Sequence, residues 1–194
     1  MIYDVIVIGG GPSGMMVAGR AGELGKKVLL LEKNNNLGEK LKITGNGRCN
    51  ITNATSDLKL LLKNFGKAEK FLYSAFVQFG VEETINFFES RGLAIKIEDH
   101  NRAFPVSENA YDVVNLLHEY LKHHHVVIKT NTTVSQLKVK NNRIVGVIVA
   151  GKLIEAKNVV IATGGASHPE TGSTGDGFKW LENLGCEVVK PTAS

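Results

Sequence analysis

A glycine-rich turn placed directly after a short apolar strand constrains the fold of this chain more than any other feature. Residues 2–8 form an apolar run with three isoleucines and two valines, and residues 9–14 then read GGGPSG. An apolar run of this length is typical of a parallel strand that is buried on both faces. Residues 12–24 carry apolar side chains at helical spacing, with proline in the first turn and Gly25 after the end. The sequence therefore predicts a strand, a tight turn and a helix.

The glycines of this turn have the spacing of a dinucleotide-binding fingerprint. Gly9 would make the turn, Gly11 would let the backbone approach a pyrophosphate, and Gly14 would let the helix pack closely on the strand. The helix start offers free N–H groups and a partial positive charge, and Ser13 adds a hydroxyl donor. The next apolar strand ends at Glu32, which can accept hydrogen bonds from a ribose diol. FAD and NAD share this ADP half, so the turn leaves the choice between them open.

The rest of the chain predicts an α/β fold with a β-meander. Helical spacing continues at residues 58–65, 67–79, 81–90, 109–124 and 178–184, and short strands are expected at residues 27–31, 93–98, 103–106 and 126–129. Alternating patterns separated by turn residues predict the three strands of the meander at residues 134–139, 144–149 and 153–156, followed by a separate apolar strand at residues 158–162. A simple NAD-dependent dehydrogenase would instead continue with strand and helix repeats, so this order disfavours it.

Composition limits the compartment and the partners. The 194 residues are 43% hydrophobic and 22% charged, as in ordinary globular proteins. The net charge of +4 is mild, and without a long basic run a nucleic-acid partner is disfavoured. The first apolar run is too short for a signal peptide or a membrane span. Cys49 and Cys186 form no CxxC pair, which suits a reducing compartment. We therefore expect a cytoplasmic protein without membrane contact.

Histidines and aromatic residues are interpreted as structural. The three adjacent histidines at residues 123–125 lack carboxylates at ligand spacing, so no metal site is expected and a solvated helix end is favoured. Trp180 and the phenylalanines between Phe65 and Phe88 follow helical spacing, which favours core packing over stacking on nucleic-acid bases.

The stretch KITGNGRCNITN at residues 42–53 is too irregular for a helix or a strand and allows three interpretations. It could be a reactive-thiol site around Cys49, an anion cradle around Arg48, or a surface loop. Cys49 has no resolving cysteine nearby, so packing against a cofactor is favoured over catalysis. Arg48 is favoured as a cofactor contact, because a guanidinium can pair with phosphate or stabilise the electron-rich end of a reduced flavin.

Several motifs together carry a family resemblance. They are GGGPSG at residues 9–14, Glu32, GEKLKITGNGRCNITN at residues 38–53, RAFPV at residues 102–106, ATGGAS at residues 162–167 and GSTGDG at residues 172–177. The set resembles the aminoacetone oxidase-like, or BaiN-like, family of bacterial NAD(P)/FAD-dependent oxidoreductases. The motifs are spread along the whole chain, and the GRCN-x-TN run is highly specific.

The resemblance implies a fold and a domain organisation. It predicts a glutathione-reductase-type, Rossmann-like FAD-binding domain, with a parallel sheet, helices and a three-stranded β-meander across which FAD lies extended. Residues 1–194 would form the N-terminal part of this FAD-binding domain. Members of the family continue into an inserted substrate domain and a C-terminal segment that returns to the FAD domain, and both are absent from this chain.

The same resemblance implies a set of cofactor-binding residues. Residues of the first turn would hold the pyrophosphate, Glu32 the adenosine ribose and the Val134 backbone the adenine. The residues from Lys40 to Asn50 would follow the pyrophosphate, the ribityl chain and the flavin edge, and no catalytic residue is identified. The full expected set is Gly9, Gly11, Pro12, Ser13, Gly14, Glu32, Lys33, Lys40, Thr44, Gly45, Asn46, Gly47, Arg48, Cys49, Asn50, Val134, Ala162, Thr163 and Gly164.

The function expected from this resemblance is that of an FAD-dependent oxidoreductase acting on a small organic substrate. It would oxidise an amine or pass electrons through the flavin to an unsaturated molecule, with NAD(P)H as electron donor or O2 as acceptor. Two alternatives stay open. The chain could be a nucleotide-binding fragment without catalytic activity, or it could belong to a flavin-dependent tRNA-modifying enzyme, which would need a concentrated basic face.

Overall fold

The computed structural model describes residues 1–189 and 191, which form two compact units. The first unit comprises Met1–Leu41 and the chain from Leu117 onward. The second comprises Lys42–Leu116 and is therefore inserted into the sequence of the first. None of the helices in this described part of the chain is both long enough and apolar enough to cross a membrane.

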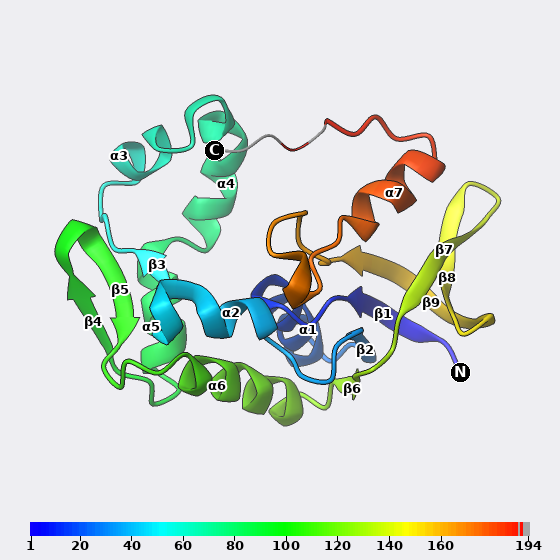
Figure 1. Ribbon diagram of the computed structural model, residues 1–194, viewed down its shortest axis with the longest axis horizontal. Coiled ribbons are helices and arrows are strands. Elements are labelled where there is room, and N and C mark those ends of the chain that lie inside the picture. The colour runs from blue at the N-terminus through cyan, green and yellow to red at the C-terminus, as the bar shows by residue number, and fades with distance from the viewer. Residues whose placement is uncertain (190, 192–194) are drawn as a thin grey trace. The chain divides into compact units, whose positions relative to one another are not determined.

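A six-stranded sheet organises the first unit, in the order β6-β2-β1-β9-β8-β7 (Figure 1). Strands β6, β2, β1 and β9 pair in parallel, whereas β9, β8 and β7 form an antiparallel meander. In the central strand, Ile8 lies opposite both Leu31 and Ile161. The strands are β1 (Tyr3–Ile8), β2 (Val28–Leu31), β6 (Val127–Lys129), β7 (Val134–Lys140), β8 (Arg143–Val149) and β9 (Lys152–Ile161). The expected parallel sheet with a meander is confirmed.

Helices complete the first unit. Helix α1 (Pro12–Glu23) follows β1 and contacts both β1 and β2. The C-terminal part of helix α6 (Ala110–His123) belongs to this unit. The ring of its Tyr120 lies so close to Gly19 that a Cβ atom added to Gly19 would be 2.1 Å from the ring. Helix α7 (Asp176–Asn183) packs Trp180 into the core formed by the central strands and the meander. The prediction that Trp180 is a core residue is therefore confirmed.

The second unit contains a small antiparallel sheet and four helices. The sheet has the order β3-β5-β4, with β3 (Thr52–Asn53), β5 (Arg102–Pro105) and β4 (Ile95–Glu98). The helices that begin within it are α3 (Leu58–Lys63), α4 (Glu69–Gln78), α5 (Val81–Glu89) and the start of α6. Helix α3 begins where the Asp57 carboxylate accepts hydrogen bonds from the backbone N–H groups of Lys59 and Leu60, as an N-cap should.

One strand prediction is wrong because a distant residue stabilises polar positions within it. Residues 153–156 and 158–162 were expected to form two strands, but β9 runs without a break from Lys152 to Ile161. Lys157 lies in the gap between the two expected strands and Asn158 at the start of the second, and both side chains bind Asp4 of the neighbouring strand. Lys157 Nζ lies 2.7 Å from Asp4 Oδ1, and Asn158 Nδ2 donates to the Asp4 carbonyl at 3.1 Å.

Two further predictions need correction. The stretch at residues 42–53, expected to be irregular throughout, contains the end of helix α2 (Glu39–Ile43), a 3-10 turn at Thr44–Gly47 and strand β3. Within this turn Gly45 and Asn46 adopt left-handed, non-helical backbone angles, so the chain kinks there. The expected core packing of the phenylalanines holds for Phe87 and Phe88 but is wrong for Phe65, Phe71 and Phe79, which are exposed. Phe71, on α4, is 84% exposed.

Candidate functional site

A cavity of about 670 Å³ lies in the first unit, at the ends of its parallel strands. Open parallel sheets bind ligands outside the carboxyl ends of their strands, where neighbouring connections leave in opposite directions. Small-molecule sites typically measure about 300–1,000 Å³, so this cavity has a suitable size. The expected cofactor-binding residues that line it are Gly9, Gly11, Pro12, Ser13, Glu32, Lys33, Lys40, Val134, Ala162, Thr163 and Gly164.

The glycine turn fits a pyrophosphate. Gly9 has a φ of 106°, which only glycine adopts readily. A Cβ on Gly14 would lie 1.9 Å from the Gly9 carbonyl oxygen, so this glycine lets α1 meet the turn and does not line the cavity. A Cβ on Gly11 would meet nothing within 4 Å, which leaves open space beside the start of α1. Anions bind in such a space because the first N–H groups of a helix point into it.

Glu32 is fixed at the cavity wall by two backbone groups. Its Oε2 accepts a hydrogen bond from Gly10 N at 2.6 Å, and its Oε1 accepts one from Asn34 N at 2.8 Å. The side chain is 8% exposed. A carboxylate oxygen has more than one lone pair, so Glu32 retains acceptor capacity for the hydroxyls of a ribose.

The segment at residues 167–176 is fastened to the chain after β2 by several side chains. Lys33 Nζ donates to Thr174 Oγ1 at 2.7 Å and to Asp176 Oδ2 at 2.9 Å. Lys40 Nζ donates to the Ser167 carbonyl at 2.6 Å. The hydrogen bond from Lys33 lowers the pKa of Asp176 below its usual value, so the carboxylate stays charged. Both lysines were expected to contact the cofactor, and each has further donors for that role.

Sequence reasoning missed part of this cavity. Ser173 and Asp176 also line it, and Ser173 is a buried polar residue. The signal was present in GSTGDG at residues 172–177, a motif that carries the family resemblance but received no role.

Apart from Gly14, the other expected residues lie in the second unit and not in the lining of this cavity. They are Thr44, Gly45, Asn46, Gly47, Arg48, Cys49 and Asn50, referred to below as the 44–50 loop. Three N–H groups shape the loop: Cys49 N donates to the Thr44 carbonyl at 3.0 Å, Arg48 N donates to the Gly45 carbonyl at 3.3 Å, and Ile51 N donates to Ala103 of β5 at 2.8 Å.

Cys49 is the least reactive kind of cysteine. Its side chain is fully buried, and its φ of 63° is unusual for a residue with a side chain. Burial raises the pKa of the thiol, against a smaller opposing effect of a hydrogen bond with Thr44. A thiol kept neutral in this way is a poor nucleophile, which favours packing over catalysis.

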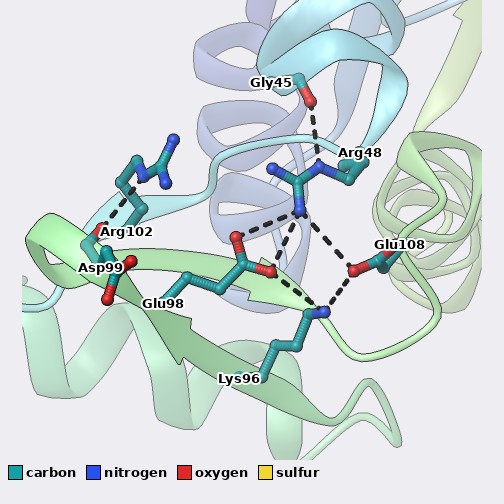
Figure 2. Close-up of polar contacts among 7 residues, drawn as sticks. All are labelled: Gly45, Arg48, Lys96, Glu98, Asp99, Arg102 and Glu108. Carbon is teal, nitrogen blue, oxygen red and sulfur yellow. Dashed lines mark hydrogen bonds and ion pairs between the residues drawn. The ribbon is translucent and has the colours of Figure 1, made fainter.

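Arg48 has carboxylate and aromatic partners within the second unit, as Figure 2 shows for the carboxylates, and its side chain is 29% exposed. Its Nη1 lies 3.0 Å from Glu98 Oε1 and 3.6 Å from Glu108 Oε1. Its guanidinium carbon lies 4.1 Å from the centre of the Phe104 ring. The expected pairing of Arg48 with a cofactor phosphate stays a prediction, but its charge already has carboxylate partners.

Histidine, cysteine and acidic side chains form no metal-binding cluster among the residues that the structure describes. No group of three or more histidine, cysteine, aspartate or glutamate side chains in this part of the chain could hold a metal ion. His123 ends helix α6, as the solvated-terminus interpretation requires.

Comparison with known sequences gives a family and two informative relatives. Residues 3–194 match the family described as HI0933-like protein Rossmann domain. A Clostridium scindens protein named 3-dehydro-bile acid delta(4,6)-reductase is 34% identical over 181 residues, which cover 92% of this chain and 43% of that protein. An Escherichia coli protein named ribosomal RNA dihydrouridine synthase is 28% identical over 191 residues, which cover 98% of this chain and 46% of that protein. The chain thus spans less than half the length of these relatives.

Comparison with solved structures shows the same fold. The 3-ketosteroid delta1-dehydrogenase from Sterolibacterium denitrificans, in complex with 1,4-androstadiene-3,17-dione, superposes with a TM-score of 0.71 at 17% identity. The match covers 94% of this chain and 55% of that chain. The predicted Rossmann-like α/β fold is confirmed.

Proposed function

The chain belongs to the HI0933-like Rossmann domain family of FAD-dependent oxidoreductases, and from this membership we propose that its first unit binds the ADP half of FAD. The observation that carries the proposal is the cavity at the strand ends, where the open space at Gly11 meets the anchored carboxylate of Glu32. The helix start of α1 would hold the pyrophosphate, and Glu32 would accept the ribose hydroxyls. The Val134 backbone, at the start of the meander, would meet the adenine.

The 44–50 loop would contact the part of FAD beyond the pyrophosphate. Its left-handed residues Gly45, Asn46 and Gly47 give the backbone a tight path, along which N–H and carbonyl groups can reach a ligand. Bound FAD would supply the transfer of two electrons, and the protein would supply position and electrostatics. Under this assignment the buried side chain of Cys49 packs within the loop and takes no part in the chemistry.

The favoured reaction is flavin-mediated reduction of an unsaturated small organic molecule, with NAD(P)H as electron donor. A relative named as a reductase of a bile acid, at 34% identity, supports reduction over amine oxidation with O2 as acceptor. Because this chain spans 43% of that relative, we propose that it forms the N-terminal part of an FAD-binding domain, and that turnover requires the remaining length. Two free cysteines, one of them exposed, support a cytoplasmic location.

The test is an FAD titration of the purified chain, followed by fluorescence quenching and absorbance. We expect saturable binding of FAD and no consumption of NAD(P)H, whereas a protein extended to the length of the relatives should turn over. Failure of both proteins to bind FAD would reject the proposal. Binding without turnover in both would favour the alternative of a nucleotide-binding protein without catalytic activity.

A second candidate is an RNA-modifying flavoenzyme, favoured by the relative named ribosomal RNA dihydrouridine synthase. The surface around α3 and α4 offers charge and rings for RNA, because exposed aromatic residues lie among lysines there. The exposed residues are Lys59, Lys63, Lys67, Lys70, Phe71 and Tyr73. RNA binding should then weaken steeply between about 50 and 200 mM salt and decline when Lys63 and Lys67 become glutamate. Absence of binding at low salt would remove this candidate.

A further inference from the structure

The guanidinium of Arg48 is held from three directions. Nη1 lies 3.0 and 3.1 Å from the two carboxylate oxygens of Glu98 and 3.6 Å from Glu108. Nε donates to the Gly45 carbonyl at 3.4 Å, inside the 44–50 loop itself. The guanidinium also lies over the Phe104 ring on β5, a favourable arrangement for a cation. One side chain thus joins this loop to the β4–β5 hairpin and to Glu108 beyond it (Figure 2).

The charges of this cluster cancel. Lys96 lies 3.0 Å from Glu98 and also contacts Glu108, so two cations meet two carboxylates. Hydrogen bonds from Lys96 lower the pKa of both glutamates, and the contact with Glu108 raises the pKa of Lys96. The two glutamates and Lys96 are therefore charged at neutral pH, and a guanidinium is always charged in proteins. A guanidinium balanced in this way offers a phosphate little net charge.

The 44–50 loop needs such support because its backbone is unfavourable by itself. Asn46 and Cys49 have φ values of 58° and 63°, in the left-handed region that side chains disfavour. Arg48 lies between them in sequence, and its side chain makes two charged hydrogen bonds to Glu98. Removing those contacts should let the loop relax toward ordinary backbone angles.

We infer that Arg48 is a positioning residue, which acts with Glu98 to hold the 44–50 loop in its binding conformation and does not itself pair with the cofactor phosphates. The inference rests on the proposed function only in taking this loop as a contact of FAD. The position of the loop can be measured without FAD, because Cys49 is fully buried within it while Cys186 is exposed.

The first test is the rate at which iodoacetamide labels each cysteine of the full chain, resolved by mass spectrometry. Arg48→Met and Glu98→Gln should each speed labelling of Cys49 about tenfold or more, the factor expected from the loss of charged hydrogen bonds. Labelling of Cys186 should not change. Unchanged protection of Cys49 in both variants would overturn the inference.

Two controls separate a local effect from general destabilisation. Arg102→Met removes an arginine from the same hairpin. Its Nε donates to the Asp99 carbonyl, and its guanidinium lies 5.7 Å from the centre of the Phe104 ring, but none of the contacts drawn in Figure 2 joins it to the 44–50 loop, so Cys49 should stay protected. Leu29→Ala weakens the core of the first unit. Leu29→Ala and Glu98→Gln are compared under conditions in which both have the same thermal stability. If Cys49 is then labelled equally fast in both variants, global unfolding explains the labelling and the inference fails.

The second test uses the sign of the effect of Glu98→Gln on FAD affinity. If Arg48 paired with phosphate, removing a competing carboxylate would tighten FAD binding. If Arg48 positions the loop, Glu98→Gln should weaken binding about as much as Arg48→Met, and the double variant should be no worse. A wild-type chain that fails to bind FAD would reject the proposed function, while the labelling experiment would still decide the role of Arg48.

Discussion

Gly11 and Gly14 differ in what one added methyl group would meet. At Gly14 it would lie 1.9 Å from the Gly9 carbonyl, so Gly14→Ala must shift backbone and should destabilise the protein by about 1–3 kcal/mol. At Gly11 it would meet open space, and the φ of −75° suits alanine. Gly11→Ala should therefore change the unfolding free energy by less than about 1 kcal/mol.

FAD affinity shows whether each of these two glycines has a role in binding beyond its role in stability. Since the open space at Gly11 is where we place the pyrophosphate, Gly11→Ala should lose at least about tenfold in FAD affinity although the fold stays intact. Urea unfolding and an FAD titration on both variants provide the measurement. Full FAD affinity in Gly11→Ala would move the pyrophosphate away from this turn.

Glu32 is expected to matter for stability as well as for the cofactor. Its two oxygens each accept a backbone N–H, and the amide of Glu32→Gln can accept only one of them. One of the two backbone N–H groups would then face the NH2 group without an acceptor. This should lower the free energy of unfolding, measured in urea, by about 1–3 kcal/mol. The matched change Glu155→Gln, at an exposed position of β9, should stay within about 0.5 kcal/mol. Equal effects of the two substitutions would contradict this role.

At the scale of elements, the ion pair between Lys33 and Asp176 joins the end of β2 to the start of α7. The pKa of Asp176 is lowered in the folded protein, first by the hydrogen bond from Lys33. A lowered pKa contributes stability above the unfolded value of about 3.9, and this contribution disappears as the pH falls through the folded value. Asp176→Asn should therefore be less stable than wild type by up to about 1 kcal/mol at pH 7.

The pH dependence of that difference identifies its cause. Urea midpoints of wild type and Asp176→Asn should differ by a constant amount above about pH 5 and converge below about pH 4. Lys33→Met should behave similarly, and adding it to Asp176→Asn should cost little more. A difference that persists unchanged to pH 3 would assign the effect to packing and not to charge.

The elements that sequence predicts well are those whose causes are local. Strand β1, its glycine turn and α1 are encoded within about two dozen neighbouring residues, by apolar spacing and by glycine and proline at fixed places. The sequence suggests a break at Lys157, but β9 is continuous there, where Lys157 and Asn158 bind Asp4 at 153 and 154 positions' distance in the chain. The exposure of Phe71 likewise depends on which elements pack against α4, and the helical spacing of apolar residues does not reveal those elements.

The same distinction applies to the site. The cavity residues near Gly9 and Glu32 could be predicted because a known chemical requirement fixes their spacing. The tethers to Asp176 and the pairing of Arg48 with Glu98 could not, because the partners stand 143 and 50 positions apart. Residue type alone suggested that Arg48 was free to meet a phosphate, and only the fold reveals the carboxylates beside it.

At the scale of the whole molecule, the expected FAD-binding residues divide between the two units. Those that would bind the ADP half lie in the first unit, and the 44–50 loop lies in the second. ADP contains the ribose and the pyrophosphate but no flavin. A comparison of FAD with ADP therefore separates the two sets of residues in one protein.

Hydrogen exchange with each ligand tests the assignment of both sets. A ligand at about 100 times its Kd stabilises the state that binds it by about 2.7 kcal/mol, enough to slow exchange near the site roughly a hundredfold. We expect FAD to slow exchange at residues 9–14 and in the 44–50 loop, and ADP to slow it at residues 9–14 alone. Protection of residues 9–14 by both ligands, without protection of the loop by FAD, would remove the loop from the FAD site while retaining the role of the first unit. Protection of both regions by ADP would instead indicate that the loop responds to the phosphates, and the assignment of the 44–50 loop to the flavin half would then be wrong.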